Sequence, residues 1–171
     1  MQNKPLLYSH YDVTFQEVPG ETSLVVEITG CLHHCQDCHS KFLWDYTGEP
    51  VERDLPKLIK KYSGLITCVC FMGGDQNIEE LMRLAHFCHK NNLKTCVYSG
   101  CTQDEFVALI PKTHFSTNMA LFDYIKVGPY IKERGGLDCV TTNQTFYKKA
   151  FAKLGYAQYE PANYLFQKEY K

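Results

Sequence analysis

The sequence predicts an α/β protein with a partial, open β/α barrel or an open α/β sheet, built from about four to five βα units. Apolar runs typical of strands alternate with amphipathic patterns typical of helices, and this alternation indicates parallel strands joined by crossover helices. The units are too few for a complete eight-fold barrel. No internal repeat, low-complexity tract or long linker divides the 171 residues, so we expect a single domain over residues 1–171.

The first part of the chain combines strand signals with a loop rich in cysteine and histidine. Residues 11–17 and 22–29 are expected to be strands, separated by a Pro-Gly turn. The Cys/His-rich loop covers residues 30–44. A helix is predicted to begin with Asp54 as its N-cap, and an apolar strand follows at residues 65–72.

Two helices carry start signals that depend on hydrogen bonding at their first turn. Asn77 and Glu80 have the spacing of an N-cap and the third helical residue, and an apolar face follows them. Thr102 and Glu105 repeat this capping-box spacing, and Pro111 is expected to stop that second helix.

The remaining predicted strands cover residues 93–99 and 121–127, and each ends at a glycine. Residues from about 148 onward are assigned to a C-terminal tail. Because active sites gather where parallel strands end, Ser99 is expected at the functional rim of the sheet.

Composition and charge exclude several classes of function. The formal net charge is −1, and the basic residues are scattered, so neither nucleic acid nor an anionic membrane is an expected partner. No apolar run is long enough to span a bilayer, and the first five residues lack the plan of a signal peptide. We therefore expect a cytoplasmic protein.

Three of the nine cysteines form a compact group with spacings of four and three, at Cys31, Cys35 and Cys38. Thiolates are soft ligands suited to iron–sulfur clusters and to zinc. Three of them can hold three irons of a 4Fe-4S cluster and leave the fourth iron open to a substrate. The alternative is a structural zinc site completed by a nearby histidine: His33, His34 or His39.

The other cysteines contain no second compact trio and are expected to be buried or incidental. They are Cys68, Cys70, Cys88, Cys96, Cys101 and Cys139.

The cysteine spacing resembles the Cys-x-x-x-Cys-x-x-Cys motif of radical S-adenosylmethionine (SAM) enzymes. From about residue 11 to about residue 147 the chain more closely resembles the activating proteins of the anaerobic ribonucleoside-triphosphate reductase, a family of glycyl radical enzyme activases. The segments that carry this resemblance are Phe15-Gln-Glu-Val-Pro-Gly20, Ile28-Thr-Gly-Cys31, Cys38-His-Ser-Lys-Phe-Leu-Trp44, Gly73-Gly74-Asp75, Tyr98-Ser-Gly100, Lys126-Val-Gly-Pro-Tyr130 and Thr142-Asn-Gln144.

The resemblance implies an oxidoreductase with a partial barrel of the radical SAM type. Its cofactors would be a 4Fe-4S cluster and SAM, which is cleaved to a deoxyadenosyl radical. The radical would abstract hydrogen from a glycine of the large reductase subunit, with electrons from a flavodoxin- or ferredoxin-type donor. The alternatives are an activase of another glycyl radical enzyme, of the pyruvate formate-lyase type, and a non-catalytic module that binds zinc or a cluster.

The resemblance also assigns roles to particular residues. The three motif cysteines would be the cluster ligands and the catalytic residues, and a glycine pair would let the backbone approach the methionine end of SAM. Asp75 would receive its ammonium group. The remaining cofactor contacts would come from Asp37, Cys38, His39, Gly73, Gly74, Ser99 and Lys126.

Overall fold

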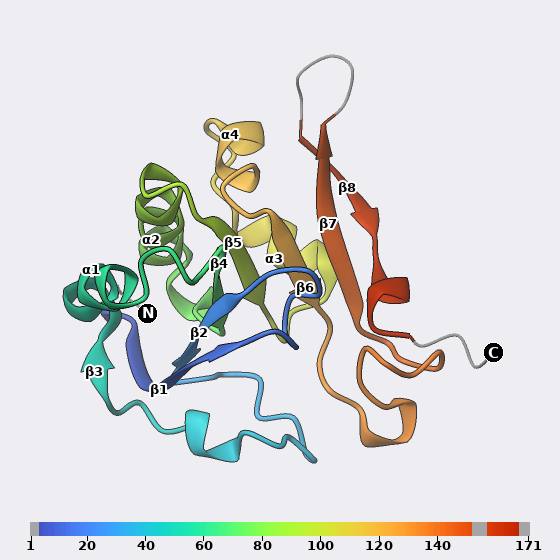
Figure 1. Cartoon of the computed structure of the whole chain (residues 1–171). Helices are drawn as coiled ribbons and strands as arrows, with labels where there is room; N and C mark the ends of the chain where they lie inside the picture. Colours follow the sequence, from blue (N-terminus) through green and yellow to red (C-terminus); the bar gives the residue numbers. More distant parts are fainter. Residues whose placement is uncertain (1–3, 152–156, 168–171) are drawn as a thin grey trace.

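The computed structural model describes residues 4–151 and 157–167, which form one open sheet with four α-helices (Figure 1). The order of the strands is β3-β1-β2-β4-β5-β6-β7-β8. The strands are β1 (Leu7–Thr14), β2 (Ser23–Ile28), β3 (Glu49–Pro50), β4 (Cys68–Met72), β5 (Lys94–Tyr98), β6 (Tyr124–Val127), β7 (Thr145–Phe151) and β8 (Ala157–Pro161). The helices are α1 (Val51–Lys61), α2 (Ile78–Lys90), α3 (Gln103–Leu109) and α4 (Phe115–Met119).

The sheet is mixed, and the expected partial β/α barrel is therefore wrong. Among the described strands, parallel pairing joins only β2, β4, β5 and β6. On one side β1 pairs antiparallel with β2 and β3 pairs antiparallel with β1. On the other side β7 pairs antiparallel with β6, and β8 with β7. These antiparallel strands occupy both edges of the parallel segment, so the sheet stays open instead of curling into a βα barrel.

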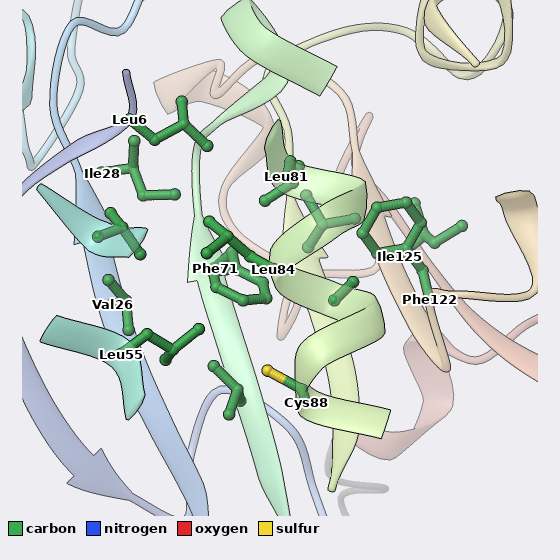
Figure 2. Packing of buried hydrophobic residues seen from close by; sticks show 14 of the residues in the cluster. Leu6, Val26, Ile28, Leu55, Phe71, Leu81, Leu84, Cys88, Phe122 and Ile125 are labelled. Carbon is green, nitrogen blue, oxygen red and sulfur yellow. The ribbon is translucent and has the colours of Figure 1, made fainter. Parts of the chain in front are cut away.

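All four helices contribute to a core on one face of the sheet. Because successive side chains of a strand point to opposite faces, Val26 of β2 and Phe71 of β4 belong to this face. Figure 2 shows Phe71 in the middle of this core, between Leu55 of α1 and Leu84 of α2. The apolar stripes of the helices thus cover one side of the sheet only.

The opposite face carries a smaller core to which no described α-helix contributes. Its strand residues include Val25, Cys70, Cys96 and Tyr124. Loop residues and the described part of the C-terminal region cover it, for example at Leu137. This helix-free face leads to the cavity described below.

Several predicted element boundaries can now be compared with the structure. Asn77 is the N-cap of α2, with its side chain accepting a hydrogen bond from the Glu80 amide, and the Thr102–Glu105 capping box begins α3; both predictions are confirmed. The prediction that Asp54 caps α1 is wrong, because that helix begins at Val51.

The Asp54 carboxylate accepts hydrogen bonds from Arg53 and Lys57 instead of capping the helix. The first strand begins at Leu7, not at residue 11, and α4 was not predicted. The predicted C-terminal tail contains most of β7 and all of β8, and its residues 152–156 and 168–171 lie outside the described part of the chain. Within the described residues, none of the helices has the length and apolar character needed to cross a membrane.

Candidate iron–sulfur site

The cysteine motif lies in a loop between β2 and β3 that is closed by its own hydrogen bonds. At its base the Thr29 hydroxyl donates to the carbonyl oxygen of Thr47, with 2.7 Å between the oxygens. Farther in, the Cys31 amide donates to the carbonyl oxygen of Leu43 at 2.9 Å. These bonds close the loop at the carboxyl end of β2 and direct the motif across the ends of the neighbouring parallel strands.

The three motif cysteines line one cavity of about 160 Å³. The Cys38 amide donates to the carbonyl oxygen of Cys35 at 3.0 Å, which makes a tight turn. The Ser40 amide donates to the Cys38 sulfur at 3.3 Å. Hydrogen bonds to a sulfur favour its negative form, and they are one of the features that tune thiolate-bound clusters.

The opposite wall of the cavity is formed where the parallel strands end. Met72 of β4, Tyr98 of β5 and Lys126 of β6 are direct neighbours in the sheet register, and all three line the cavity. Two loops far apart in the sequence reach this end of the sheet in Figure 1, one after β2 and one after β6. The cavity therefore draws on residues from Ile28 to Tyr130.

Lys126 is a buried cation directed at this cavity. Its ammonium group donates to the carbonyl oxygen of Gly128 at 2.9 Å. Burial lowers the pKa of the Lys126 ammonium to about 8, and the thiols of Cys35 and Cys38, with Asp75, act in the opposite direction. A buried ammonium is costly unless negative groups offset it, so the cavity favours anionic occupants.

The Thr142-Asn-Gln144 segment braces the turn that holds Lys126. The Gln144 amide donates to the carbonyl oxygen of Gly128 at 3.4 Å, and the Asn143 amide donates to that of Pro129 at 2.8 Å. A Cβ atom on Gly128 would lie 2.9 Å from the Asn143 carbonyl oxygen, and its φ of +105° also favours glycine. This gives a physical role to a segment to which the sequence alone assigned none.

Asp75 is the buried carboxylate of the site. His33 Nε2 lies 2.9 Å from Asp75 Oδ2, and the Ser99 hydroxyl donates to the same oxygen. Burial would raise the pKa of Asp75, but the hydrogen bonds from His33 and Ser99 outweigh it and the pKa is lowered. The hydrogen bond to Asp75, followed by that to Cys101, raises the pKa of His33 to about 10. Both shifts favour the carboxylate form of Asp75 and the imidazolium form of His33.

Two further residues, both from the loop that follows β5, belong to this group. The Cys101 sulfur lies 3.7 Å from Asp75 Oδ2 and 3.8 Å from His33 Nε2. Its amide donates to the Ser99 hydroxyl oxygen at 3.0 Å. A Cβ atom on Gly100 would lie 2.5 Å from two ring carbons of His33, so the ring packs directly on that glycine.

The two predicted glycines have different surroundings. Gly73 lines the cavity with a φ of +102°. Gly74 does not line it; a Cβ atom there would lie 3.0 Å from the side chain of Ile28 and 3.1 Å from that of Leu81. The absence of a side chain at Gly74 thus serves packing of α2 against β2.

Two other predicted contacts also lie away from the cavity wall. Neither Asp37 nor His39 lines the cavity. The His39 ring is exposed and packs on Tyr130, with 4.8 Å between ring centroids, and Tyr130 does line the cavity.

The histidines near the motif are engaged elsewhere, which bears on the zinc alternative. His33 is bonded to Asp75, the His34 ring stacks on Trp44 at 4.7 Å between centroids, and His39 packs on Tyr130. Of the motif-loop donors that line the cavity, His33 is already bonded to Asp75, which leaves the three thiols to act together. A donor set of three thiols beside a buried cation fits an iron–sulfur cluster with one open iron.

The three thiols in one cavity indicate an iron–sulfur protein, and a family comparison shows the same class. A family model described as a 4Fe-4S single cluster domain matches residues 18–134, well over half of the chain. The chain belongs to this family, and a 4Fe-4S cluster is its cofactor. No curated protein and no solved structure matches the chain.

Sequence reasoning missed several residues that line or adjoin the cavity. Met72 and Tyr98 could have been found from the alternation of β4 and β5, which directs the last residue of each strand to the same face as Lys126. The contacts of Asp75 with His33 and Cys101 could not be predicted from spacing, because the three residues come from different loops.

Proposed function

We propose that this protein is a radical SAM activase, an oxidoreductase that generates a glycyl radical on the large subunit of the anaerobic ribonucleoside-triphosphate reductase. The observation that carries the proposal is the convergence of three thiols, a buried carboxylate and a buried ammonium group in one cavity. The cysteines alone suit any 4Fe-4S protein. The carboxylate and the ammonium group add one charge of each sign, and these could pair with the ammonium and carboxylate groups of a zwitterionic cofactor such as SAM.

Cys31, Cys35 and Cys38 would hold the cluster through three of its irons. When bound, the cluster supplies the electron that cleaves the sulfonium of SAM and yields a deoxyadenosyl radical. The Ser40 amide would stabilise the Cys38 thiolate through its bond to the sulfur. The loop bonds at the base of the motif would hold the three sulfurs on the same side.

Asp75 and Lys126 would orient the amino-acid end of the cofactor. Asp75 is 8% exposed, and its pKa is lowered, so it remains a carboxylate that can accept an ammonium donor. Lys126 offers the opposite charge, and it could attract a carboxylate or offset the charge of the thiolates. The positive φ of Gly73 favours glycine at this turn, where a Cβ atom would lie 3.3 Å from the carbonyl oxygen of Ile28.

The substrate of the radical would be a glycine in a loop of the partner protein. The helix-free face of the sheet adjoins the cavity through Met72, which lines both the cluster cavity and a hollow over β1 and β2. A hollow on this face leaves room for a protein segment beside the cofactor. The electron donor would be a flavodoxin- or ferredoxin-type protein, and the complex would form in the cytoplasm.

The first experiment compares single replacements of Cys31, Cys35 and Cys38 by Ala with Cys139→Ala after anaerobic reconstitution with iron and sulfide. Cys139 lies outside the cavity and is a matched control for loss of one thiol. We expect about four irons per chain and reductive SAM cleavage in the parent and in Cys139→Ala, and loss of both in the other three. A stable cluster without SAM cleavage would leave the family membership intact and overturn the proposed activity.

A second experiment identifies the partner. The reduced, cluster-loaded protein and SAM are incubated with the anaerobic ribonucleoside-triphosphate reductase or with a pyruvate formate-lyase, and the glycyl radical is detected by electron paramagnetic resonance. We expect the radical on the reductase. A radical on the lyase alone would move the assignment to the other class of activase.

A further inference from the structure

A second group of metal-ligating side chains takes one member, His33, from the three-cysteine loop and the other two, Asp75 and Cys101, from the segments after β4 and β5. One nitrogen of His33, one oxygen of Asp75 and the sulfur of Cys101 all lie within 4.8 Å of one another. The separations are 2.9 Å for nitrogen to oxygen, 3.7 Å for sulfur to oxygen and 3.8 Å for sulfur to nitrogen. Asp75 and Cys101 are buried.

This triangle has the size of one face of a tetrahedral metal site. Zinc lies at about 2.0 to 2.3 Å from nitrogen, oxygen and sulfur ligands, which sets its tetrahedral ligands roughly 3.4 to 3.6 Å apart. The two sulfur separations lie within about 0.2 Å of that range, and the nitrogen–oxygen separation is about 0.5 Å shorter than its lower limit. Small rotations of the side chains would therefore bring all three atoms to bonding distance of one ion.

We propose that His33, Asp75 and Cys101 form a mononuclear site for a divalent transition-metal ion of the zinc class, distinct from the three-cysteine cluster site. The nitrogen and sulfur donors select such an ion over magnesium or calcium, which take oxygen ligands. Three protein ligands leave a fourth position open, as in zinc sites that bind water or a small molecule. Binding releases the proton shared by His33 and Asp75 and the thiol proton of Cys101 to solvent.

The neighbours of the triad orient its ligands as the outer shell of a metal site does. Ser99 donates to the liganding oxygen of Asp75 and accepts a bond from the Cys101 amide, so one hydroxyl fixes two ligands. Gly100 gives the His33 ring its position against the chain, since a Cβ atom there would overlap the ring. Such partners commonly change metal affinity by about 10- to 100-fold.

The direct test removes the cluster site and keeps the triad. In the full chain with Cys31, Cys35 and Cys38 replaced by Ser, cobalt(II) serves as the spectroscopic probe. We expect one cobalt per chain, with tetrahedral ligand-field bands and a thiolate-to-cobalt charge-transfer band. Adding Cys101→Ser should abolish that band and weaken binding at least about tenfold, whereas adding Cys139→Ser should change neither.

Bound cobalt whose spectrum and affinity ignore Cys101→Ser would overturn the proposal, as would no binding by a chain whose circular dichroism shows the native fold. If the triple replacement does not fold, the comparison moves to the cluster-loaded parent and its Cys101→Ser variant, both exposed to zinc. One zinc per chain in the parent and none in the variant is the expected result. Equal zinc in both would overturn the site.

The site also predicts a way to control the proposed activity, and this consequence rests on the proposed function. Asp75 cannot bind a metal and the ammonium group of SAM at the same time. Zinc should therefore inhibit SAM cleavage competitively with SAM. The metal titration involves no SAM, so its outcome stands whether or not the cleavage activity is found.

Discussion

Gly100 offers a sharp test of how the cysteine loop is attached to the sheet. A Cβ atom at this position would lie 2.5 Å from Cγ and Cδ2 of His33 and 3.1 Å from its Cβ, and these are the nearest atoms it would meet. Gly100→Ala therefore acts on one side chain. The His33 ring must move, and its hydrogen bond to the buried Asp75 carboxylate is lost.

The expected size of this effect follows from two terms. Overpacking costs about 1 to 3 kcal/mol, and a hydrogen bond to a charged group contributes about 1.5 to 3 kcal/mol. The His33 side chain is 25% exposed, so water offsets part of the second term. Because the ring avoids the overlap by breaking the bond, the terms do not add. We expect Gly100→Ala to lower the free energy of unfolding by about 1 to 3 kcal/mol.

A double-mutant cycle isolates this contact. Urea unfolding of the metal-free chain, followed by circular dichroism, is measured for the parent, Gly100→Ala, His33→Ala and the double variant. In the His33→Ala background only the contact with the Cβ of residue 33, at 3.1 Å, remains, so the added methyl group should cost less than about 1 kcal/mol. An equal cost in both backgrounds would refute the packing of His33 on Gly100.

Three other predictions concern the fold. Gly48 has a φ of +120°, and a Cβ atom there would lie 2.2 Å from a carbonyl oxygen of β1. Because backbone strain and overlap add, Gly48→Ala should lower the free energy of unfolding, measured in urea, by at least about 3 kcal/mol. Gly64→Ala is the matched control, because it has a φ of +77° with no atom within 4 Å, and an equal loss there would contradict the role of the overlap. Asn77→Ala should cost about 1 kcal/mol by removing the N-cap acceptor of α2, and Asn77→Ser should cost less; equal stability of Asn77→Ala and the parent would exclude the cap. Burial would raise the pKa of Glu21, but hydrogen bonds, the first of them from Lys94, outweigh burial and lower the pKa. The ionised Glu21 therefore stabilises the fold above its ordinary pKa of 4.5, and this stabilisation is lost as the pH falls through the lowered pKa. Unfolding curves of the parent and Glu21→Gln should differ at pH 7 and converge in acid, and a constant difference would show that ionisation of Glu21 plays no part.

The parallel part of the sheet could be predicted from the sequence because its signals are local. Apolar runs mark β4, β5 and β6, and the capping spacings at Asn77 and Thr102 place α2 and α3 between them. The antiparallel pairing at the edges of the sheet could not be predicted in this way. Whether β6 meets another parallel strand or the antiparallel β7 depends on pairing between distant segments, which a local pattern does not contain.

The candidate site shows the same division. Cys31, Asp75, Ser99 and Lys126 reach one cavity because parallel strands place their carboxyl ends at one edge. The direction of each loop side chain is set by its contacts in three dimensions. His39 follows the cysteine motif and is exposed, whereas Cys101 follows β5 and is buried. Their positions in the sequence do not predict this difference in burial.

The distribution of the site along the chain has a consequence for its biosynthesis. The three thiols leave the ribosome long before Lys126, which donates to the same Gly128 carbonyl oxygen as the still later Gln144. A nascent chain that ends within α2 would present the thiols with neither the buried cation nor the wall formed by β5 and β6. Assembly of the complete cavity is thus a late event in translation, and iron that arrives earlier would meet an unfinished and more exposed set of ligands.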